Sequence, residues 1–448
     1  MTALIVPGEA TATPERMPFT VIDQAVHLLD TAAEPWGIQL EVALDGRLDE
    51  ERLRAAVGRA AAAHPMARAR QLPARRSDHT WTWEIAPSLD LNPVRVVTCL
   101  DEAAVSHVRD ELYSRQVPLV ESPPFRLVLV RRPGGDLLLF NANHAAFDGF
   151  GCLRLLQAVA HHYAGRPDPT PAVALEEARD VHRLLAAPDR RSRIRRLRLL
   201  AGKATDLIRT PARLAAEGAR RGPGYRFHIS ALTEEQTRRL ASGGGPTIND
   251  LLVAAVIRSV EGWNGEHGRD SGRISLLVPV NLRPMEWRKD VVTNMVLETR
   301  VAADRSDRDD SDSLLAAVRT QSEGIKRGGG AALMELIGGW RSLPLWTKQP
   351  LRALLTLTGS RLVCTAVASN LGQLSEPPDF GSDAGAVRGV WFSAPARMPC
   401  GLSLGVVTVS GRLHLSFRVR TQLLGAEALG RFAGRFEADL LALAEAGR

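Results

Sequence analysis

His144 and Asp148 are the residues of this chain whose types and spacing are best suited to chemistry. The apolar run Leu137–Asn143 predicts a buried strand, and His144 stands where the chain leaves that strand for a loop ending at Gly149. A histidine held there is rigid yet accessible, and an ordinary pKa of about 6.5 leaves its imidazole mostly neutral at pH 7. It could therefore take a proton from a hydroxyl, an amine or a thiol.

The other residues of this loop have both a chemical and a structural interpretation. Asp148 could orient the imidazole of His144 or lock the turn through a salt bridge, and Gly149 permits a tight bend. A His-x-x-x-Asp spacing is also common by chance, so the residue types alone leave a purely structural role open.

Alternating apolar residues predict the strands that must position this loop. Phe125–Arg131 is expected to pair, across a Pro-Gly-Gly turn, with the strand that ends before His144, and an amphipathic helix follows the loop. A second set of strands and helices starts at Tyr225 and ends in a hairpin (residues 406–419) and a last helix. The predicted fold class is α/β or α+β. Its parts are an N-terminal half (residues 1–180), a basic helical linker (181–224) and a C-terminal half (225–448).

The composition excludes several classes of protein. With 45% hydrophobic and 24% charged residues, the chain is not intrinsically disordered. Four cysteines without a CxxC pair indicate neither a disulfide framework nor a zinc module, and we expect no metal. The sequence contains no apolar run long enough to span a membrane, so no transmembrane segment is predicted. Residues 1–17 lack the basic start and apolar core of a signal peptide, which predicts a cytoplasmic protein.

The net charge of +7 is concentrated in one segment. Residues 190–221 hold eleven Lys and Arg against Asp206 and Glu217, so the rest of the chain is nearly neutral. Three interpretations stay open: solvated linking helices, a docking surface for an acidic carrier protein or the phosphates of CoA, and a peripheral contact with an anionic membrane. Nucleic acid is not expected as a partner, because few aromatic residues interleave with the arginines.

The run His144–Gly149 reads His-Ala-Ala-Phe-Asp-Gly and resembles the HxxxDG motif of the chloramphenicol-acetyltransferase-like superfamily. That superfamily includes peptide-synthetase condensation domains, wax-ester synthases and polyketide-associated acyltransferases. The resemblance covers nearly the whole chain, because further stretches match in the expected order. These stretches are Gly46–Asp49, His64-Pro65, Pro123–Arg126, Thr247–Leu252, Pro279–Pro284 with Asn294, and Ser369–Gly372.

The resemblance implies two sandwich halves that meet in a V, with a central channel between them. His144 would lie in mid-channel as the general base, and the acyl group would pass directly to the acceptor without a covalent acyl-enzyme. Asp148 and Gly149 would be structural, and Arg283 would be the ion-pair partner of Asp148 from the second half.

Four further residues are candidates for contact with the substrate or with the oxyanion of a tetrahedral intermediate. Asn143 stands where many members of the superfamily have a first histidine, and Asn294 belongs to a matching stretch of the second half. Ser369 and Asn370 are expected near the channel, although an ordinary turn would explain these two equally well.

A competing motif is Gly401–Gly405, which fits the G-x-S-x-G nucleophile elbow of α/β-hydrolases. That elbow needs a strand before the serine and a helix after it. Here the sequence continues into the predicted hairpin of residues 406–419, so Ser403 is not expected to be a nucleophile.

The sequence therefore predicts an acyltransferase of condensation-domain type. It would move an acyl group from acyl-CoA, or from the phosphopantetheinyl thioester of an acyl or peptidyl carrier protein, to a hydroxyl or amine of a small molecule or lipid. No adenylation or carrier domain is recognisable in the chain, so the thioester is expected from CoA or a separate carrier protein, with no permanently bound cofactor. The alternative is a non-catalytic condensation-like domain that serves as a binding or recruitment platform.

Overall fold

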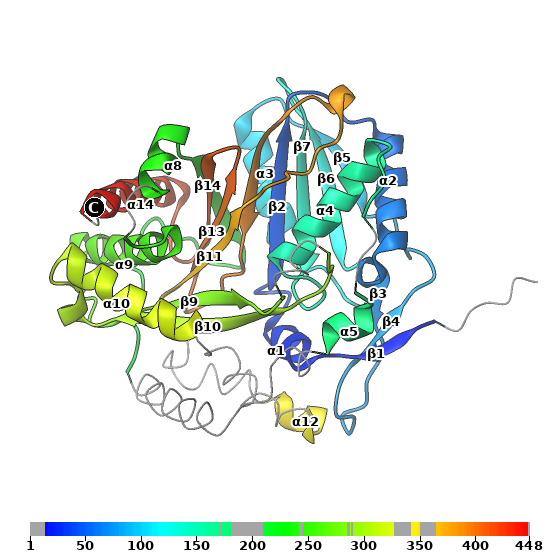
Figure 1. Cartoon of the computed structure of the whole chain (residues 1–448). Helices are drawn as coiled ribbons and strands as arrows, with labels where there is room; N and C mark the ends of the chain where they lie inside the picture. The colour runs from blue at the N-terminus through cyan, green and yellow to red at the C-terminus, as the bar shows by residue number, and fades with distance from the viewer. Residues whose placement is uncertain are drawn as a thin grey trace, which may run out of the picture.

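The computed structural model of the chain describes residues 14–169, 173–180, 209–241, 245–284, 287, 290–326, 342–349 and 364–446. Within these residues the strands form three sheets. The two larger sheets lie next to each other, with helices on their outer sides (Figure 1). The predicted fold class, a mixed α/β protein in two halves, is therefore confirmed.

The five-stranded sheet carries the motif loop. Its strands, in spatial order, are β12 (Val387–Ser393), β2 (Gly37–Leu44), β7 (Leu137–Asn143), β6 (Phe125–Arg131) and β5 (Val94–Thr98). One face packs against α2 (Glu50–Ala63) and α4 (Gly149–Tyr163), and the other against α3 (Glu102–Tyr113). Because both faces are covered, every residue of β2 and β7 is buried, and the motif loop starts from a rigid central strand.

The six-stranded sheet forms the core of the second half. Its strands, in spatial order, are β10 (Val296–Ala303), β9 (Ile274–Asn281), β11 (Ala366–Gln373), β13 (Leu402–Val409), β14 (Arg412–Arg420) and β8 (Tyr225–Ala231). The outer face packs against α9 (Ile248–Glu266), α10 (Ser311–Gly324) and α14 (Ala426–Ala446), with α8 (Glu234–Ala241) beside them. The other face turns toward the first half.

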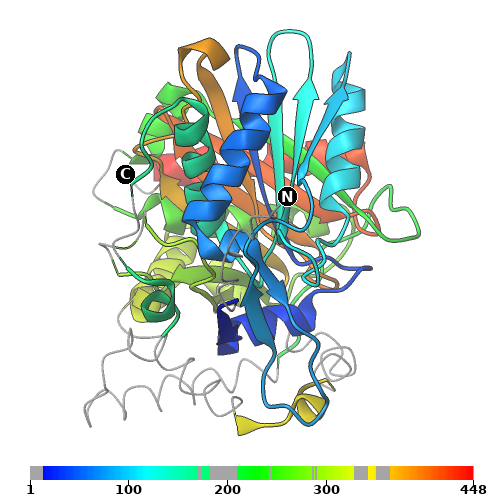
Figure 2. The ribbon, with the colours of Figure 1, turned by 90° about the vertical axis from the view of Figure 1, so that its right-hand side faces the viewer.

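Smaller elements close the lower side of the molecule in Figure 1. They are β1 (Arg16–Pro18), β3 (Ala69–Gln71) and β4 (Thr82–Ile85), the helices α1 (Val21–Leu29), α5 (Leu175–Arg179) and α12 (Leu345–Lys348), and the 3-10 turn η1 (Pro65–Arg68). Two further 3-10 turns lie elsewhere: η4 (Arg305–Arg308) follows β10, and η7 (Ser382–Ala384) lies at the top of Figure 1. Figure 2 shows α12 beside the loop between β3 and β4. There the Leu345 N–H donates to the carbonyl of Asp78 at 2.7 Å, so this helix is attached to the first half.

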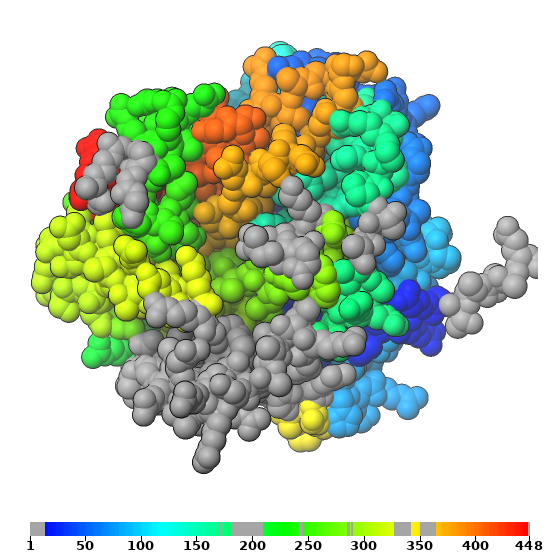
Figure 3. Space-filling model, in the orientation of Figure 1, coloured from blue at the N-terminus to red at the C-terminus, as the bar shows by residue number. Residues whose placement is uncertain are grey.

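Strand β12 belongs to the second half in sequence but to the first half in space. It pairs antiparallel with β2, with Trp391 opposite Glu41, and Phe392 enters the core of the first half. In the space-filling view, the orange residues that precede it lie against the teal surface of α4 (Figure 3). The predicted C-terminal half, residues 225–448, is wrong for this strand, because a boundary placed at a break in composition does not detect a strand that crosses to the other sheet.

The predicted basic helical linker is described only from residue 209 onward, and residues 209–224 contain no helix. Pro211 and the left-handed Gly218 (φ 62°) interrupt any helical path. Leu214 is buried in the second core, and the Glu217 N–H donates to the carbonyl of Leu423 at 2.8 Å. The prediction of a helix is wrong here, because packing against the second half holds this stretch in an irregular conformation. Residues 190–208, which carry most of the positive charge, lie outside the described residues.

The two sheets approach closely at Gly405 of β13. A Cβ atom built there would lie 1.9 Å from the carbonyl oxygen of Phe392, a backbone atom of β12. Gly405→Ala is therefore expected to lower the free energy of unfolding by at least about 2 kcal/mol, because the strands must move apart. Gly434→Ala is the matched control: its Cβ meets nothing within 4 Å in α14, so it should stabilise slightly. Urea denaturation of both variants measures this, and a neutral Gly405→Ala would contradict the close approach.

Candidate active site

A cavity of about 230 Å³ lies between the two halves, and His144 is part of its wall. The sheet of the second half contributes alternate residues of β9 and β10, which places these side chains on one face, and neighbouring residues of β11. They are Leu277, Pro279 and Asn281 of β9, Val296 and Glu298 of β10, and Val367, Ser369, Asn370, Leu371 and Gly372 of β11. The first half contributes Ile38 and the motif loop, so the cavity wall needs both halves.

His144 follows β7 directly and is only 5% exposed. Its Nδ1 lies 2.9 Å from the carbonyl oxygen of Phe147. Because a carbonyl only accepts hydrogen bonds, Nδ1 must carry the ring proton of the neutral imidazole, and Nε2 keeps a free lone pair. The motif loop thus fixes the tautomer that a proton acceptor needs.

Burial also keeps this imidazole neutral. Desolvation lowers the pKa of His144 below its ordinary value of 6.5, and the nearby Asp148 carboxylate offsets only part of that effect. At neutral pH the group is therefore ready to accept a proton at Nε2.

Asp148 joins the motif loop to the second half rather than orienting the imidazole. Its Oδ1 caps α4 by accepting from the N–H of Gly151 at 2.8 Å. Its Oδ2 accepts from Nη1 of Arg283 at 2.5 Å and from the N–H of Met295 at 2.7 Å. Both side chains of the ion pair are at most 1% exposed. The pair expected from the sequence is present, and it ties the two halves together beside the cavity.

Gly149 lets side chains from distant parts of the chain reach the motif loop. A Cβ atom at this position would lie 2.8 Å from side-chain carbons of Leu371 and of Phe392. Any larger residue would push these two cavity-lining residues away, which gives Gly149 the structural role expected from the sequence.

Asn143 and Asn294, expected as substrate contacts, are not among the residues that line this cavity. The amide of Asn143 donates to Asp30 and to the carbonyl of Val117, each at 2.8 Å, and its oxygen accepts from the N–H of Ala145. Both of its N–H groups are therefore used. The amide of Asn294 donates to the carbonyl of His144 at 2.8 Å, so it positions the main chain at the motif.

Ser369 and Asn370 both line the cavity. They lie within β11, not in a turn, and an irregular register after Asn370 brings both side chains to this wall. The Asn370 side-chain oxygen accepts from the N–H of Gly372 at 2.8 Å. The Ser369 hydroxyl has no hydrogen-bond partner among the described residues, which leaves it able to contact a bound molecule.

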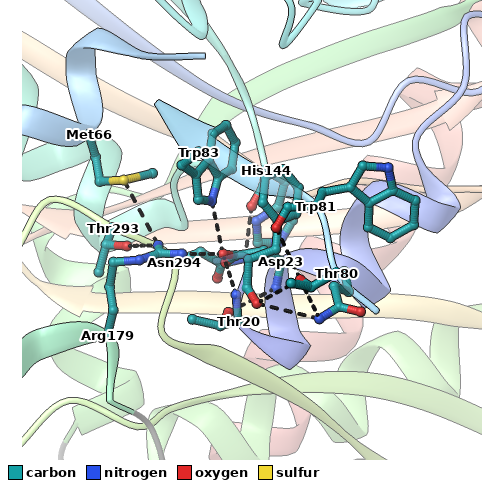
Figure 4. A network of polar contacts seen from close by, with 12 residues as sticks. Thr20, Asp23, Met66, Thr80, Trp81, Trp83, His144, Arg179, Thr293 and Asn294 are labelled. Carbon is teal, nitrogen blue, oxygen red and sulfur yellow. Dashed lines mark hydrogen bonds and ion pairs between the residues drawn. The ribbon is translucent and has the colours of Figure 1, made fainter. Parts of the chain in front are cut away.

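A buried polar network supports the segment that contacts the motif loop (Figure 4). Arg179 of α5 donates to Asp23 of α1 and, at 2.9 Å, to the hydroxyl of Thr293. Asp23 also accepts from the indole N–H of Trp83 at 3.1 Å. Since Thr293 adjoins Asn294, the network anchors the residue that holds the main chain of His144.

Ser403 and the cysteines take no part in this site. Ser403 is fully buried within β13, and its hydroxyl donates to the carbonyl of Ala394 at 2.8 Å. The chain then continues into the β13–β14 hairpin, so no nucleophile elbow is formed, as predicted. The four free cysteines are buried as well.

Glu298 is a titratable cavity residue that the sequence did not reveal. Burial raises the pKa of this carboxyl to about 7. A glutamate at an alternate position of a strand is the only signal in the sequence, and it does not reveal which face of the strand meets the cavity.

Comparisons with known proteins agree with this architecture. No family model matches the chain. The uncharacterized proteins MT2362 and Rv2305 of two Mycobacterium tuberculosis strains (CDC 1551 / Oshkosh and H37Rv) are each 35% identical to it over 411 residues, which cover 90% of this chain and 94% of theirs.

In the part of the chain that the structure describes, no helix is both long and apolar enough to span a membrane.

Several solved structures share the fold at low sequence identity. The first condensation domain of the calcium-dependent antibiotic synthetase matches with a TM-score of 0.70 at 16% identity, over 97% of both chains. The epimerization domain from the third module of tyrocidine synthetase B matches with 0.61 at 16% identity, over 98% of this chain and 99% of that one. SgcC5 of Streptomyces globisporus gives 0.63 at 17%, over 96% and 99%. The chain therefore belongs to one family with the two mycobacterial proteins, and its fold is the condensation-domain fold of these solved structures.

Proposed function

We propose that the chain is an acyltransferase that moves an acyl group from a thioester directly to an acceptor hydroxyl or amine. The observation that carries this proposal is the neutral imidazole of His144, with the lone pair of Nε2 free, in a cavity built by both halves. The condensation-domain fold supports acyl transfer as the type of reaction.

In the proposed reaction, the acceptor gives its proton to Nε2 of His144 while its oxygen or nitrogen bonds to the thioester carbonyl carbon. The tetrahedral intermediate then collapses, the C–S bond breaks, and the thiol leaves with the proton from the imidazolium. The carbonyl of Phe147 accepts from Nδ1 throughout, which stabilises the imidazolium. The free hydroxyl of Ser369 is the candidate donor to the oxyanion, with Asn370 as a substrate contact.

The proposed donor is acyl-CoA or an acyl or peptidyl carrier protein that carries a phosphopantetheinyl thioester. The reaction needs no further cofactor and no metal, because the thioester itself supplies the activated acyl group. The acceptor is a small molecule or a lipid, and the basic residues 190–221 are a candidate contact for a carrier protein, CoA phosphates or an anionic membrane.

A screen of donors and acceptors tests the proposal. Acyl-CoAs and acyl-carrier proteins would be mixed with pooled alcohols and amines, free thiol would be followed, and the protein would be weighed by intact-mass spectrometry. We expect thiol release that depends on the acceptor, with no acylated protein. If no donor in the panel reacts, the result would favour the non-catalytic recruitment platform. An acyl adduct on the protein would contradict direct transfer and indicate a covalent acyl-enzyme.

The pH dependence of kcat/KM should show whether the reaction requires the neutral imidazole of His144. With an uncharged acceptor, kcat/KM is expected to rise with pH to a plateau, because the base must be deprotonated. The midpoint should lie below pH 6.5, since burial lowers the pKa of His144. Initial rates between pH 5 and pH 8.5 measure this profile. A midpoint clearly above 6.5 would mean that a different group acts as the base.

A further inference from the structure

Glu298 places a carboxyl group in the cavity wall that the proposed reaction does not use. Side chains alternate along β10, which turns Val296 and Glu298 to the cavity. Glu298 pairs with Pro279 of β9, and Pro279 lines the cavity too. In the part of the chain that the structure describes, no side chain or backbone N–H donates to this carboxylate, and burial is the sole cause that shifts its pKa.

Charged and titratable groups approach Glu298 from several elements. They are His144 and Asp148 of the motif loop, Arg300 further along β10, and the thiols Cys364 and Cys400. Burial keeps the imidazole neutral and the two thiols protonated. Asp148 already has its own arginine, and Arg300 is engaged with the sulfur of Cys364. Within the described residues, none of these groups gives Glu298 a cationic partner.

An unpaired carboxylate in such a wall is best compensated by a cation that enters with a ligand. Burial raises the pKa of Glu298 to about 7, because the charged form loses solvation without gaining a partner. A ligand ammonium group would supply that partner. A hydrogen bond to a charged group changes affinity by about tenfold to a hundredfold, so this one contact is large enough to decide which ligand is preferred.

We propose that Glu298 selects an acceptor with a positively charged nitrogen and holds that nitrogen while the nucleophile of the acceptor faces His144. This inference rests on the proposed function, because it names the class of acceptor. The donor is a poorer fit to this wall, since the phosphates of CoA or phosphopantetheine are anionic and a carboxylate repels them.

The kinetic test compares an amino alcohol with an acceptor of the same skeleton in which a methyl group replaces the ammonium. Wild type should prefer the amino alcohol by about tenfold or more in kcat/KM. Glu298→Gln should lose that preference, so that its kcat/KM values for the two acceptors agree within about threefold. Glu445→Gln, an exposed glutamate at the end of α14, is the matched control and should behave as wild type. A preference that survives in Glu298→Gln would overturn the proposal.

A binding experiment keeps this inference separate from the proposed function. Calorimetric titration of the amino alcohol and its uncharged analogue, without any donor, should show tighter binding of the cation by wild type but not by Glu298→Gln. The affinity for the cation should increase between pH 6 and pH 8, as Glu298 ionises, and His144→Ala should retain this increase. Equal affinity of wild type for both ligands would refute the inference. Selective binding without any acyl transfer would refute the proposed function and leave the inference standing.

Folding of the test variant is checked by its melting temperature. Because its pKa is raised from 4.5 to about 7, Glu298 lowers stability progressively as the pH rises through that range. Glu298→Gln removes this effect, so at pH 8 its melting temperature should equal or exceed that of wild type. A lower melting temperature would show that Glu298 has a partner in the folded protein, which contradicts the inference.

Discussion

Replacing Asp148 with Asn is expected to lower the free energy of unfolding by about 3–5 kcal/mol. The substitution leaves the guanidinium of Arg283 buried and without its counter-charge, because that side chain is fully buried beside the motif loop. Its Nη2 would still donate to the carbonyl of Thr293 at 2.7 Å, but carbonyl groups alone do not replace a carboxylate. The motif aspartate is thus expected to act mainly through folding and not through proton transfer.

Urea denaturation of Asp148→Asn, Arg283→Met and the double variant measures this effect. The double variant should be less destabilised than the sum of the two single variants, because removing both charges leaves no unpaired charge. Glu235→Gln is the control: its ion pairs with Arg238 and Arg239 are largely exposed and should each be worth less than about 1 kcal/mol. If Asp148→Asn were no more destabilising than this control, the ion pair could not be what joins the halves at the cavity.

The sequence predicted the motif loop and its partner because both depend on short, well-separated signals. The alternation before His144 indicated the strand, and the resemblance to the superfamily implied that Arg283 is the partner of Asp148. Both features are present in the structure. The α/β class followed from the same periodicities, since each half mixes strands with amphipathic helices.

Features that depend on long-range packing were missed or predicted wrongly. The side-chain amide of Asn143 donates hydrogen bonds to Asp30 and to the carbonyl of Val117, and nothing in the local sequence indicates that these two residues lie nearby. Strand β12 crosses to the other sheet although its sequence is typical of any buried strand. Glu298 faces the cavity only because of the register between β9 and β10. In each case the outcome is decided by which segments meet in space, and residue spacing along the chain does not contain that information.

His144→Ala is expected to reduce acyl transfer by a factor of about 100 or more, because it removes the only proton acceptor assigned to the reaction. The substitution should leave the fold intact. The side chain makes a hydrogen bond to the carbonyl of Phe147 and faces the cavity, so its loss enlarges an existing space and leaves no charge unpaired. This separates it from Asp148→Asn, whose expected loss of activity follows from unfolding.

The most direct measurement is the initial rate of acceptor-dependent thiol release by wild type, His144→Ala and His107→Ala at pH 7.5. His107 is an exposed histidine of α3 and serves as the matched control. We expect His107→Ala to keep the wild-type rate, and His144→Ala to lose at least about 100-fold in rate at an unchanged melting temperature. A folded His144→Ala protein whose rate stays within a few-fold of wild type would contradict the assignment of His144 as the general base.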